Sequence, residues 1–282
     1  MRIKADLTLL FVSIIWGSAF AAQRIAANAG SVYFFNGFRF ILAALVLIPF
    51  IKNLTFLEGQ LLWMFISGGI LFLGSALQQA GMLTTTAGNA GFITTLYVVI
   101  VPLLVFAGWR EKPNWLSIIA VGLAAYGAYL LSTAGRYIVR TGDWLELAGA
   151  FFWALHVILL GKIAPKYNFL VFAAGQYIVA GLLNTSMGFW WRETANLYSL
   201  ELIASILYTA LFSVSIGYTL QVWAQRHTPP MDAALILSLE AVFAGITGWL
   251  ILQETLEPIQ VAGCGLILIA VILAQARQWG FR

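Results

Sequence analysis

The chain has 282 residues, of which 61% are hydrophobic and 9% charged, and its formal net charge is +4. A soluble domain is typically about 45–50% apolar and about 25% charged, so this composition excludes a mostly water-facing surface. The basic residues sit singly in short loops, which argues against a nucleic-acid partner, and the one cysteine, Cys264, excludes an intrachain disulfide and a cysteine-based metal cluster.

Ten apolar stretches follow one another along the chain. A helix needs about 20 mostly apolar residues to cross hydrocarbon, and these stretches are about twice as long as the strands of a membrane barrel. In lipid the backbone must satisfy its own hydrogen bonds, which a helix does. The sequence therefore predicts an all-α integral membrane protein with ten transmembrane helices, over residues 5–23, 33–51, 60–83, 91–109, 115–133, 144–161, 169–189, 201–223, 231–252 and 259–276.

The first stretch has a second interpretation. Arg2 and Lys4 precede an apolar run that ends in Ala19-Phe20-Ala21, which is the pattern of a cleaved secretory signal. We favour a transmembrane helix, because the run is long enough to span a membrane and a similar segment recurs around Trp153, where no signal peptide could act.

Lysine and arginine are shared unevenly between the two sides of this topology. Ten lie on the side of the N-terminus: Arg2, Lys4, Lys52, Arg110, Lys112, Lys162, Lys166, Arg226, Arg277 and Arg282. Four lie on the other side: Arg24, Arg136, Arg140 and Arg192. Positive residues mark the cytoplasmic side of a membrane protein, so both termini are predicted to be cytoplasmic.

The two halves of the chain resemble each other. The aligned pairs include Asp6 with Asp143 and Trp16 with Trp153 at an offset of 137, then Gln78 with Gln221, Tyr97 with Glu240 and Glu111 with Glu254 at an offset of 143. Each half holds five spans, an odd number, so the second half must be inverted relative to the first. We predict two inverted five-helix repeats, over residues 1–135 and 141–279. Inverted repeats build many secondary transporters, with the substrate site near the midplane between the halves, although duplication also builds scaffolds.

Motifs in both halves resemble the EamA branch of the drug/metabolite transporter superfamily over nearly the whole chain. They are Trp16-Gly17-Ser18, Arg39, Gln78 to Gly81, Thr84 to Gly91, Glu111, Tyr218 to Gln221, Ala233 to Phe243 and Leu252-Gln253-Glu254. The resemblance implies a central cavity lined mainly by spans one, three, four, six, eight and nine, efflux of amino acids, related metabolites or drugs, and a bacterial inner membrane.

The chain departs from this family in span nine. The family often has proline after the glutamate of that span, whereas Glu240 is followed by Ala241. A kink in span nine is therefore not assured, while Pro102 could kink span four.

Two aromatic residues occupy equivalent positions in spans one and six. Trp16 and Trp153 lie mid-span, away from the interface where tryptophan is usual, and His156 follows Trp153 by about one turn. They could form the walls of a cavity for an apolar or aromatic solute, or simply pack in the core. His156 could relay a proton, although a hydrogen-bonded neutral histidine is the commoner state.

Ionisable and amide side chains at membrane depth are costly and need a reason. Glu240 could bind a cationic or amino group or take up a proton, whereas Arg39 could attract a carboxylate or reach the headgroups as a structural residue. Gln78 and Gln221 are matched amides, and Tyr218 lies about one turn before Gln221. Tyr97 aligns with Glu240 across the repeat. These polar groups could orient the polar end of a substrate or join helices.

The sequence thus favours a secondary transporter that exports small metabolites, such as amino acids or aromatic compounds, by alternating access. The candidate substrate-binding residues are Trp16, Gln78, Tyr97, Trp153, His156, Tyr218, Gln221 and Glu240, with Glu240 and His156 as proton-coupling candidates. The alternatives are a proton-coupled multidrug efflux carrier and a non-transporting structural membrane protein. No phosphate-binding loop, metal motif or nucleophile motif occurs in the sequence, so we expect no enzyme, no cofactor and no metal. The expected partners are a small-molecule substrate and the lipid bilayer, and the oligomeric state stays open, with a monomer compatible.

Overall fold

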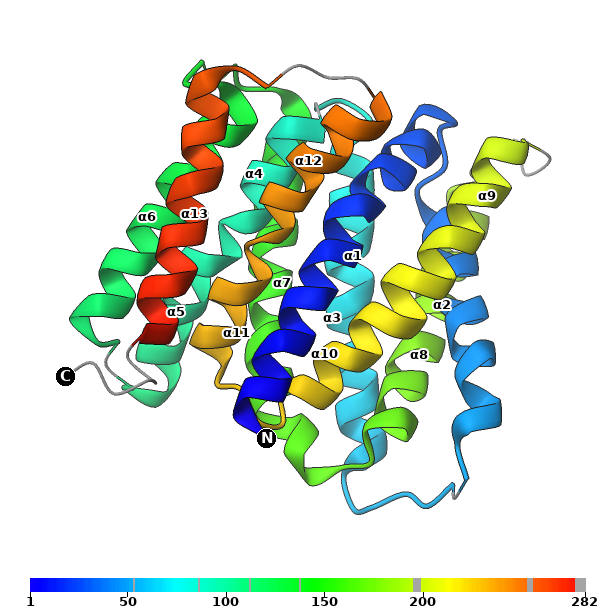
Figure 1. Cartoon of the computed structure of the whole chain (residues 1–282). Coiled ribbons are helices and arrows are strands. Elements are labelled where there is room, and N and C mark those ends of the chain that lie inside the picture. Colours follow the sequence, from blue (N-terminus) through cyan, green and yellow to red (C-terminus); the bar gives the residue numbers. More distant parts are fainter. Residues whose placement is uncertain are drawn as a thin grey trace.

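The computed structural model describes residues 1–52, 54–85, 87–111, 113–136, 138–194, 199–252 and 256–276, and within them every regular element is helical (Figure 1). The helices of the first half are α1 (Arg2–Asn28), α2 (Tyr33–Leu47), η1 (Ile48–Phe50), α3 (Gln60–Gly81), α4 (Ala87–Thr95), α5 (Tyr97–Trp109) and α6 (Trp115–Thr133). Those of the second half are α7 (Thr141–Ile163), η2 (Ala164–Lys166), α8 (Phe169–Trp190), α9 (Leu200–Tyr208), η3 (Thr209–Tyr218), α10 (Thr219–Ala224), α11 (Pro230–Leu237), α12 (Glu240–Leu252) and α13 (Pro258–Ala276).

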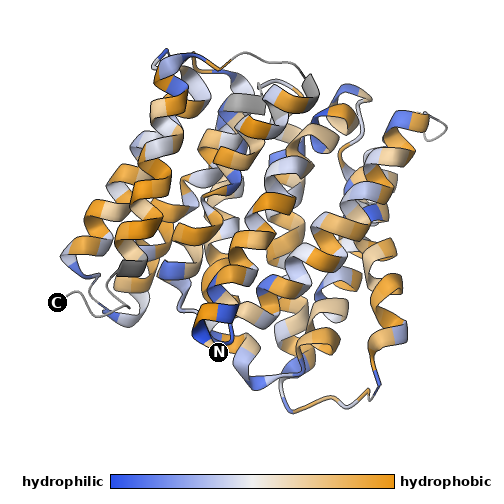
Figure 2. Ribbon diagram, in the orientation of Figure 1, coloured by the Kyte–Doolittle hydropathy of each residue, from blue (hydrophilic) through white to orange (hydrophobic). Residues whose placement is uncertain are grey.

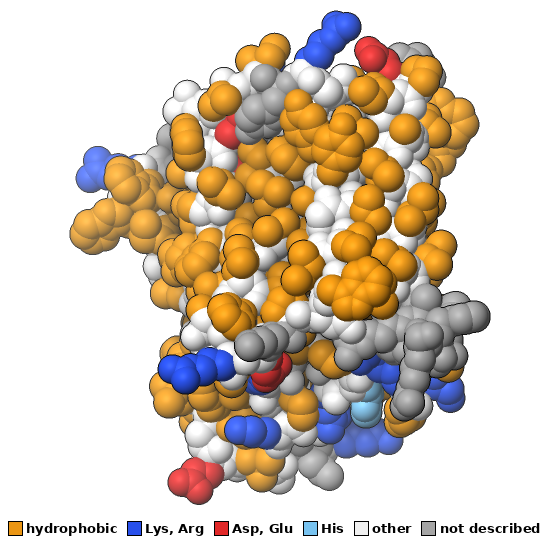
Figure 3. Space-filling view, turned by 90° about the vertical axis from the view of Figure 1, so that its left-hand side faces the viewer, with side chains coloured by type: hydrophobic (Ala, Val, Ile, Leu, Met, Phe, Trp, Pro, Cys, Tyr) orange, Lys and Arg blue, Asp and Glu red, His pale blue; other side chains and the backbone are white. Residues whose placement is uncertain are grey.

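These helices form the ten predicted spans. Among the described residues, nine segments have the length and hydropathy to cross a membrane, and α13 adds a tenth, shorter apolar run at Pro258–Ala274. Hydrophobic residues cover much of the length of the helices in Figure 2 and the middle of the face shown in Figure 3. The chain is therefore a multi-pass membrane protein, and which side its termini face stays a prediction.

The end of the first span differs most from the prediction. The first span was expected to end at residue 23, yet α1 continues through Arg24 to Asn28. The Arg24 guanidinium donates through Nη1 to the backbone oxygens of Met82, in a very short contact, and of Thr85 at 3.0 Å. Carbonyls at the end of a helix lack intrahelical partners and carry the negative end of its dipole, so they hold this cation inside the bundle.

Two spans are interrupted at equivalent positions of the repeat. Span four breaks at Leu96, between α4 and α5, and span nine breaks at Ser238 and Leu239, between α11 and α12. Leu96 and Leu239 are the same repeat position at the offset of 143. The break in span four does not lie at Pro102, which is inside α5, and span nine breaks without a proline.

The halves are inverted and interlocked. In Figure 1, α1 starts at the end of the bundle that carries the N-terminus, whereas α7 starts at the opposite end. The first span of each half packs against the third span of the other half. Thus α1 packs on span eight, which consists of α9, η3 and α10, and α7 packs on α3. This arrangement confirms the two inverted five-helix repeats, while their exact residue limits stay a prediction.

Glycine permits both of these crossings. A Cβ atom on Gly217 would lie 2.7 Å from the indole nitrogen of Trp16, and one on Gly74 would lie 3.2 Å from the ring of Trp153. Gly74 and Gly217 are equivalent at the offset of 143, as Trp16 and Trp153 are at the offset of 137. Each tryptophan therefore lies on the glycine of the other half.

The same reciprocity holds at the two ends of the bundle. Near the N-terminus, Thr228 Oγ1 donates to the Asp6 carboxylate at 2.8 Å. At the other end, Thr85 Oγ1 donates to the Asp143 carboxylate in a very short contact. Because Thr85 and Thr228 are repeat equivalents, as are Asp6 and Asp143, matched hydrogen bonds join the halves at both ends.

Spans five and ten pack tightly on each other through small residues. A Cβ atom on Gly127 of α6 would lie 2.7 Å from the backbone oxygen of Gly263 and 3.0 Å from the amide nitrogen of Ile267, both on α13, whereas one on Gly122 would meet nothing within 4 Å. Close backbone approach at glycine is how membrane helices gain packing contact.

We expect Gly127→Ala to lower the free energy of unfolding by about 1–3 kcal/mol, because two backbones must separate to admit the methyl group. Thermal unfolding of the purified protein in detergent measures the loss. Gly122→Ala, on the same helix, is the matched control and should be neutral or slightly stabilising. Equal melting temperatures for the two variants would contradict the packing described.

Candidate functional site

A small cavity lies between the two halves of the bundle. It measures about 40 Å³, room for about two or three water molecules. The lining residues are Trp16, Phe20 and Gln23 of α1, Arg39 of α2, Gln78 of α3, Thr94 of α4, Tyr97 of α5, Trp153, His156 and Val157 of α7, Ser213 and Tyr218 of η3, Gln221 of α10 and Glu240 of α12. Spans one, three, four, six, eight and nine contribute, as the family resemblance implied, and span two is added through Arg39.

All eight residues singled out in the sequence line this cavity: Trp16, Gln78, Tyr97, Trp153, His156, Tyr218, Gln221 and Glu240. They come from six spans of both halves, so the inverted fold is what brings them together. Their contact with a substrate stays a prediction.

Tyr218 is the centre of an aromatic cluster in this cavity. Its ring centroid lies 4.7 Å from that of Trp16, 6.0 Å from that of Trp153 and 5.9 Å from that of His156. Tyr218 is the last residue of η3, a ten-residue π-helical stretch. Such stretches are rare and occur often at functional sites. The Trp16 indole also donates to the backbone oxygen of Ser213 in η3 at 3.1 Å, so the π-helical stretch positions two aromatic residues.

Arg39 lies inside the bundle and not at the headgroups. Its side chain is only 2% exposed, its guanidinium carbon sits 4.9 Å from the ring of Phe35 and 5.2 Å from that of Phe40, and its Nε makes no hydrogen bond. Within the described ranges it forms no ion pair. Arg39 therefore does not reach the headgroups, which was one of the two possibilities that the sequence left open, because the aromatic rings of α2 hold the cation toward the cavity.

Glu240 and Tyr97 follow the two helix breaks. Each is the first residue of its helix, α12 and α5, so each side chain starts where the backbone of the span is interrupted. The Tyr97 hydroxyl and the Glu240 carboxylate face each other without the geometry of a hydrogen bond, and Glu240 is 4% exposed. Discontinuous helices at corresponding positions of two repeats mark the binding sites of many transporters.

His156 is held by a polar group of α8. Its Nε2 lies 3.1 Å from Oε1 of Gln176, which also accepts a hydrogen bond from Ser67 at 2.5 Å. The ring therefore has a fixed partner behind it and an aromatic contact with Tyr218 in front. This geometry fits a hydrogen-bonded histidine that forms part of the wall.

The matched amides differ in their partners. Gln78 donates through Nε2 to Thr94 Oγ1 at 2.9 Å and so joins α3 to α4. Gln221 is 1% exposed, and its Oε1 makes no hydrogen bond. Gln78 thus joins two helices, while Gln221 has a buried acceptor oxygen without a partner.

Unsatisfied polar atoms are concentrated in this cavity. Six lining residues have a buried side-chain nitrogen or oxygen without a hydrogen-bond partner: Gln23, Arg39, Tyr97, Trp153, Gln221 and Glu240. Most buried polar groups in proteins are paired, because leaving one unpaired costs about 1–3 kcal/mol. A cation, a carboxylate, amides and aromatic faces around one space can bind a small solute with both polar and apolar parts.

Reasoning from the sequence missed several lining residues. Phe20 and Gln23 follow Trp16 at spacings of four and seven, so they lie on its face of α1 and could have been found by that period. Thr94 and Ser213 carry no such signal, because one binds Gln78 and the other is placed by the π-helical stretch.

Comparison with known sequences gives two matches to one family model. The EamA-like transporter family matches residues 3–133 and 140–275, once in each half. An uncharacterized transporter of Archaeoglobus fulgidus is 35% identical over 276 residues, which are 98% of this chain and 87% of that protein.

More distant matches agree with the fold. The threonine/homoserine exporter RhtA of Escherichia coli K12 is 25% identical over 287 residues, which cover 96% of this chain and 91% of the exporter. A protein of known crystal structure superposes with a TM-score of 0.82 at 15% identity and covers 99% of this chain and 100% of its own. At that identity the structural likeness shows the fold alone.

We expect Arg39→Met to leave the free energy of unfolding unchanged or to raise it by about 1–2 kcal/mol, because the cost of burying an unpaired cation exceeds the lost contacts with Phe35 and Phe40. Thermal unfolding in detergent measures the change. The control is Arg24→Met, which removes the donor to two backbone carbonyls and should cost about 1–3 kcal/mol. A loss at Arg39 as large as that at Arg24 would show that Arg39 serves the fold.

Proposed function

Since the chain belongs to the EamA-like transporter family, we propose that it exports small metabolites, such as amino acids or aromatic compounds, by alternating access. The observation that carries the proposal is the central cavity, in which six side chains from both inverted halves have buried polar atoms without a protein partner. A family of transporters and a site of this kind argue against an enzyme.

The cavity offers complementary groups for a solute with two charges. The Arg39 guanidinium suits a carboxylate, and the Glu240 carboxylate suits an ammonium group. The rings of Trp16, Trp153 and Tyr218 suit an apolar or aromatic side chain. The similarity to a threonine/homoserine exporter supports both the amino-acid class and the outward direction.

The interlocked halves supply the means of alternating access. Hydrogen bonds from Thr228 to Asp6 and from Thr85 to Asp143 join the halves at opposite ends of the bundle. Opening one end while the other stays joined would expose the cavity to one side at a time, since the two halves are near-equivalent in structure. We place both termini in the cytoplasm on the distribution of lysine and arginine, and we place the protein in a bacterial inner membrane on its resemblance to the family.

A proton-coupled multidrug efflux carrier is the second candidate. Glu240 is a buried carboxyl that faces Tyr97 and lies in the same cavity as the aromatic cluster. A proton and a cationic drug would compete for it, which is one way to couple an ion to a substrate. His156 could titrate in its place, although it is bonded to Gln176. A structural membrane protein without transport would leave the unsatisfied cavity unexplained.

Counterflow in proteoliposomes tests the function. We expect the purified protein to exchange labelled L-threonine, L-homoserine or L-tryptophan across the membrane. The double variant Trp16→Ala/Trp153→Ala should lose this exchange, because both aromatic walls disappear. The matched control Trp190→Ala/Trp191→Ala removes two exposed tryptophans outside the cavity and should keep it. No exchange of any of the three solutes by the wild type would count against the proposed substrate class.

Accumulation driven by a pH gradient tests coupling through Glu240. In the same vesicles, Glu240→Gln should abolish gradient-driven accumulation, because the amide cannot exchange a proton. Glu257→Gln changes an exposed glutamate and serves as the control. Unaltered accumulation in Glu240→Gln would rule out coupling through that group.

A further inference from the structure

A second buried carboxyl lies outside the cavity. Glu146 sits in α7, between the start of the helix and the cavity residue Trp153, and its side chain is 0% exposed. The segment that contains it has the hydropathy of a membrane span. A fully buried acid in such a segment needs a physical reason.

The contacts of Glu146 leave one carboxyl oxygen unpaired. Thr94 Oγ1 lies 3.3 Å from Glu146 Oε2, and Thr94 also accepts the hydrogen bond from Gln78, so a polar chain leads to the cavity. Oε1 makes no hydrogen bond. It lies over Gly81 of α3, where an added Cβ atom would be 2.9 Å away, so that glycine makes room for the carboxyl group.

No cation compensates a charge on this group within the described part of the chain. On α7 the ionisable group that acts on Glu146 is Asp143, another acid, about one turn away. The ionisable side chains on the helices packed against α7 interact with other residues. Tyr97 of α5 faces Glu240, and Asp232 of α11 pairs with Arg2 at the other end of the bundle. From α3 and α4, the residues in contact are Gly81 and Thr94. An ionised carboxylate here would be buried beside a like charge, whereas a protonated one would be neutral.

Lys166 of η2 lies at the opposite end of α7 from Glu146. Arg24 of α1, near the end of α3, is bound to the backbone oxygens of Met82 and Thr85. Neither forms an ion pair with Glu146. The nearby cation is therefore committed to carbonyls and not to this acid.

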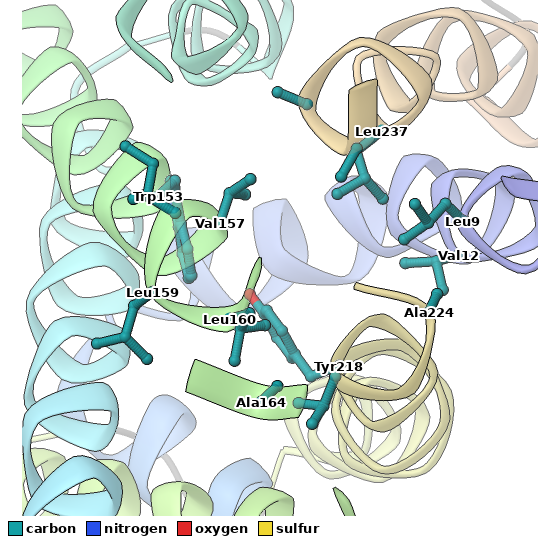
Figure 4. Packing of buried hydrophobic residues seen from close by; sticks show 14 of the residues in the cluster. Leu9, Val12, Trp153, Val157, Leu159, Leu160, Ala164, Tyr218, Ala224 and Leu237 are labelled. Carbon is teal, nitrogen blue, oxygen red and sulfur yellow. The ribbon is translucent and has the colours of Figure 1, made fainter. Parts of the chain in front are cut away.

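At the equivalent site, near the N-terminus, the three matching residues are apolar. At the repeat offsets, Glu146, Thr94 and Gly81 correspond to Leu9, Leu237 and Ala224. These three are buried members of one hydrophobic cluster, in which Figure 4 shows them near one another. The fold can thus be built here with leucine, so packing alone does not require the acid.

Asp143 lines a hollow at the surface of the bundle. A hollow at the surface between α4 and α7 is lined by Phe92, Ile93, Leu96, Val139, Asp143, Trp144 and Leu147. Asp143 is therefore within reach of this hollow on one side and about one helical turn from Glu146 on the other. The groups run in order from the hollow through Asp143, Glu146 and Thr94 to Gln78 in the cavity wall.

We propose that Glu146 is a proton-binding site, whose carboxyl holds one proton in this conformation and exchanges it with water at the Asp143 end of the bundle. The proton leaves the neutral acid as the carboxylate forms, and it returns when the site closes. Because the equivalent residue is Leu9, only one half has the site, so proton binding distinguishes the two ends of the near-symmetric fold. The use of this proton to drive transport rests on the function proposed above, whereas its presence on Glu146 does not.

Infrared difference spectroscopy of the full chain in detergent tests the protonation directly. At neutral pH, the spectrum of the wild type minus Glu146→Gln should contain the carbonyl band of a carboxylic acid, shifted in heavy water. Wild type minus Glu58→Gln, an exposed control, should lack that acid band. Carboxylate bands in both differences would overturn the proposal.

A double variant guards against misfolding of the single one. Glu146→Leu/Thr94→Leu copies the apolar pair Leu9 and Leu237 and keeps Gly81, where a Cβ atom would lie 2.9 Å from the backbone oxygen of Gly142, so it should fold and lack the same acid band. An acid band that persists in this variant would overturn the assignment to Glu146.

Vesicle transport separates this proposal from the proposed function. Accumulation driven by a pH gradient should be lost in Glu146→Gln and kept in Glu58→Gln. Accumulation equal to that of the wild type in Glu146→Gln would overturn a role in coupling. If the wild type transports none of the three amino acids named above, the proposed substrate class fails, while the infrared result still decides whether Glu146 carries a proton.

Discussion

The structure depends on the packing of each tryptophan of a first span on a glycine of the third span in the other half. Trp16 lies on Gly217 and Trp153 lies on Gly74, so each contact joins a residue of one half to a residue of the other. Because the two contacts are related by the inverted repeat, they bring the matched aromatic residues to one place near the middle of the bundle. The ring of Tyr218 then sits between both tryptophans.

Around this aromatic centre the protein tolerates polar atoms that the fold itself does not satisfy. Arg39, Glu240 and Gln221 are nearly fully buried and each has an unpaired polar atom. The interrupted spans explain part of this arrangement, since Glu240 and Tyr97 begin the second segment of a broken helix. Stability given up at a binding site is a common compromise between stability and function. The surrounding core is apolar and closely packed, and its packing offsets the free energy lost at these unpaired atoms.

Much of the fold could be predicted from the sequence, because lipid permits few backbone solutions and a long apolar run identifies a helix. The repeat then related Trp16 to Trp153 and Tyr97 to Glu240, which pointed to one cavity. Burial of Arg39 could not be foreseen, since whether a long side chain turns inward depends on the rings of its neighbours. Glu146 was within a predicted span, yet its proposed role as a proton-binding site came only from comparing its contacts with those of Leu9. The breaks at Leu96 and Leu239 were not predicted, because neither position carries a proline.

The small volume of the central cavity has a consequence for how selectivity arises. A space with room for about two or three water molecules is smaller than an amino acid such as threonine, so a solute of that size does not fit the conformation described here. Shape matching against this closed form would therefore reject true and false substrates alike. Substrates must therefore be distinguished while the cavity widens. The solute that is carried is the one whose contacts with the open cavity offset the free energy lost when Trp16, Trp153 and Tyr218 separate.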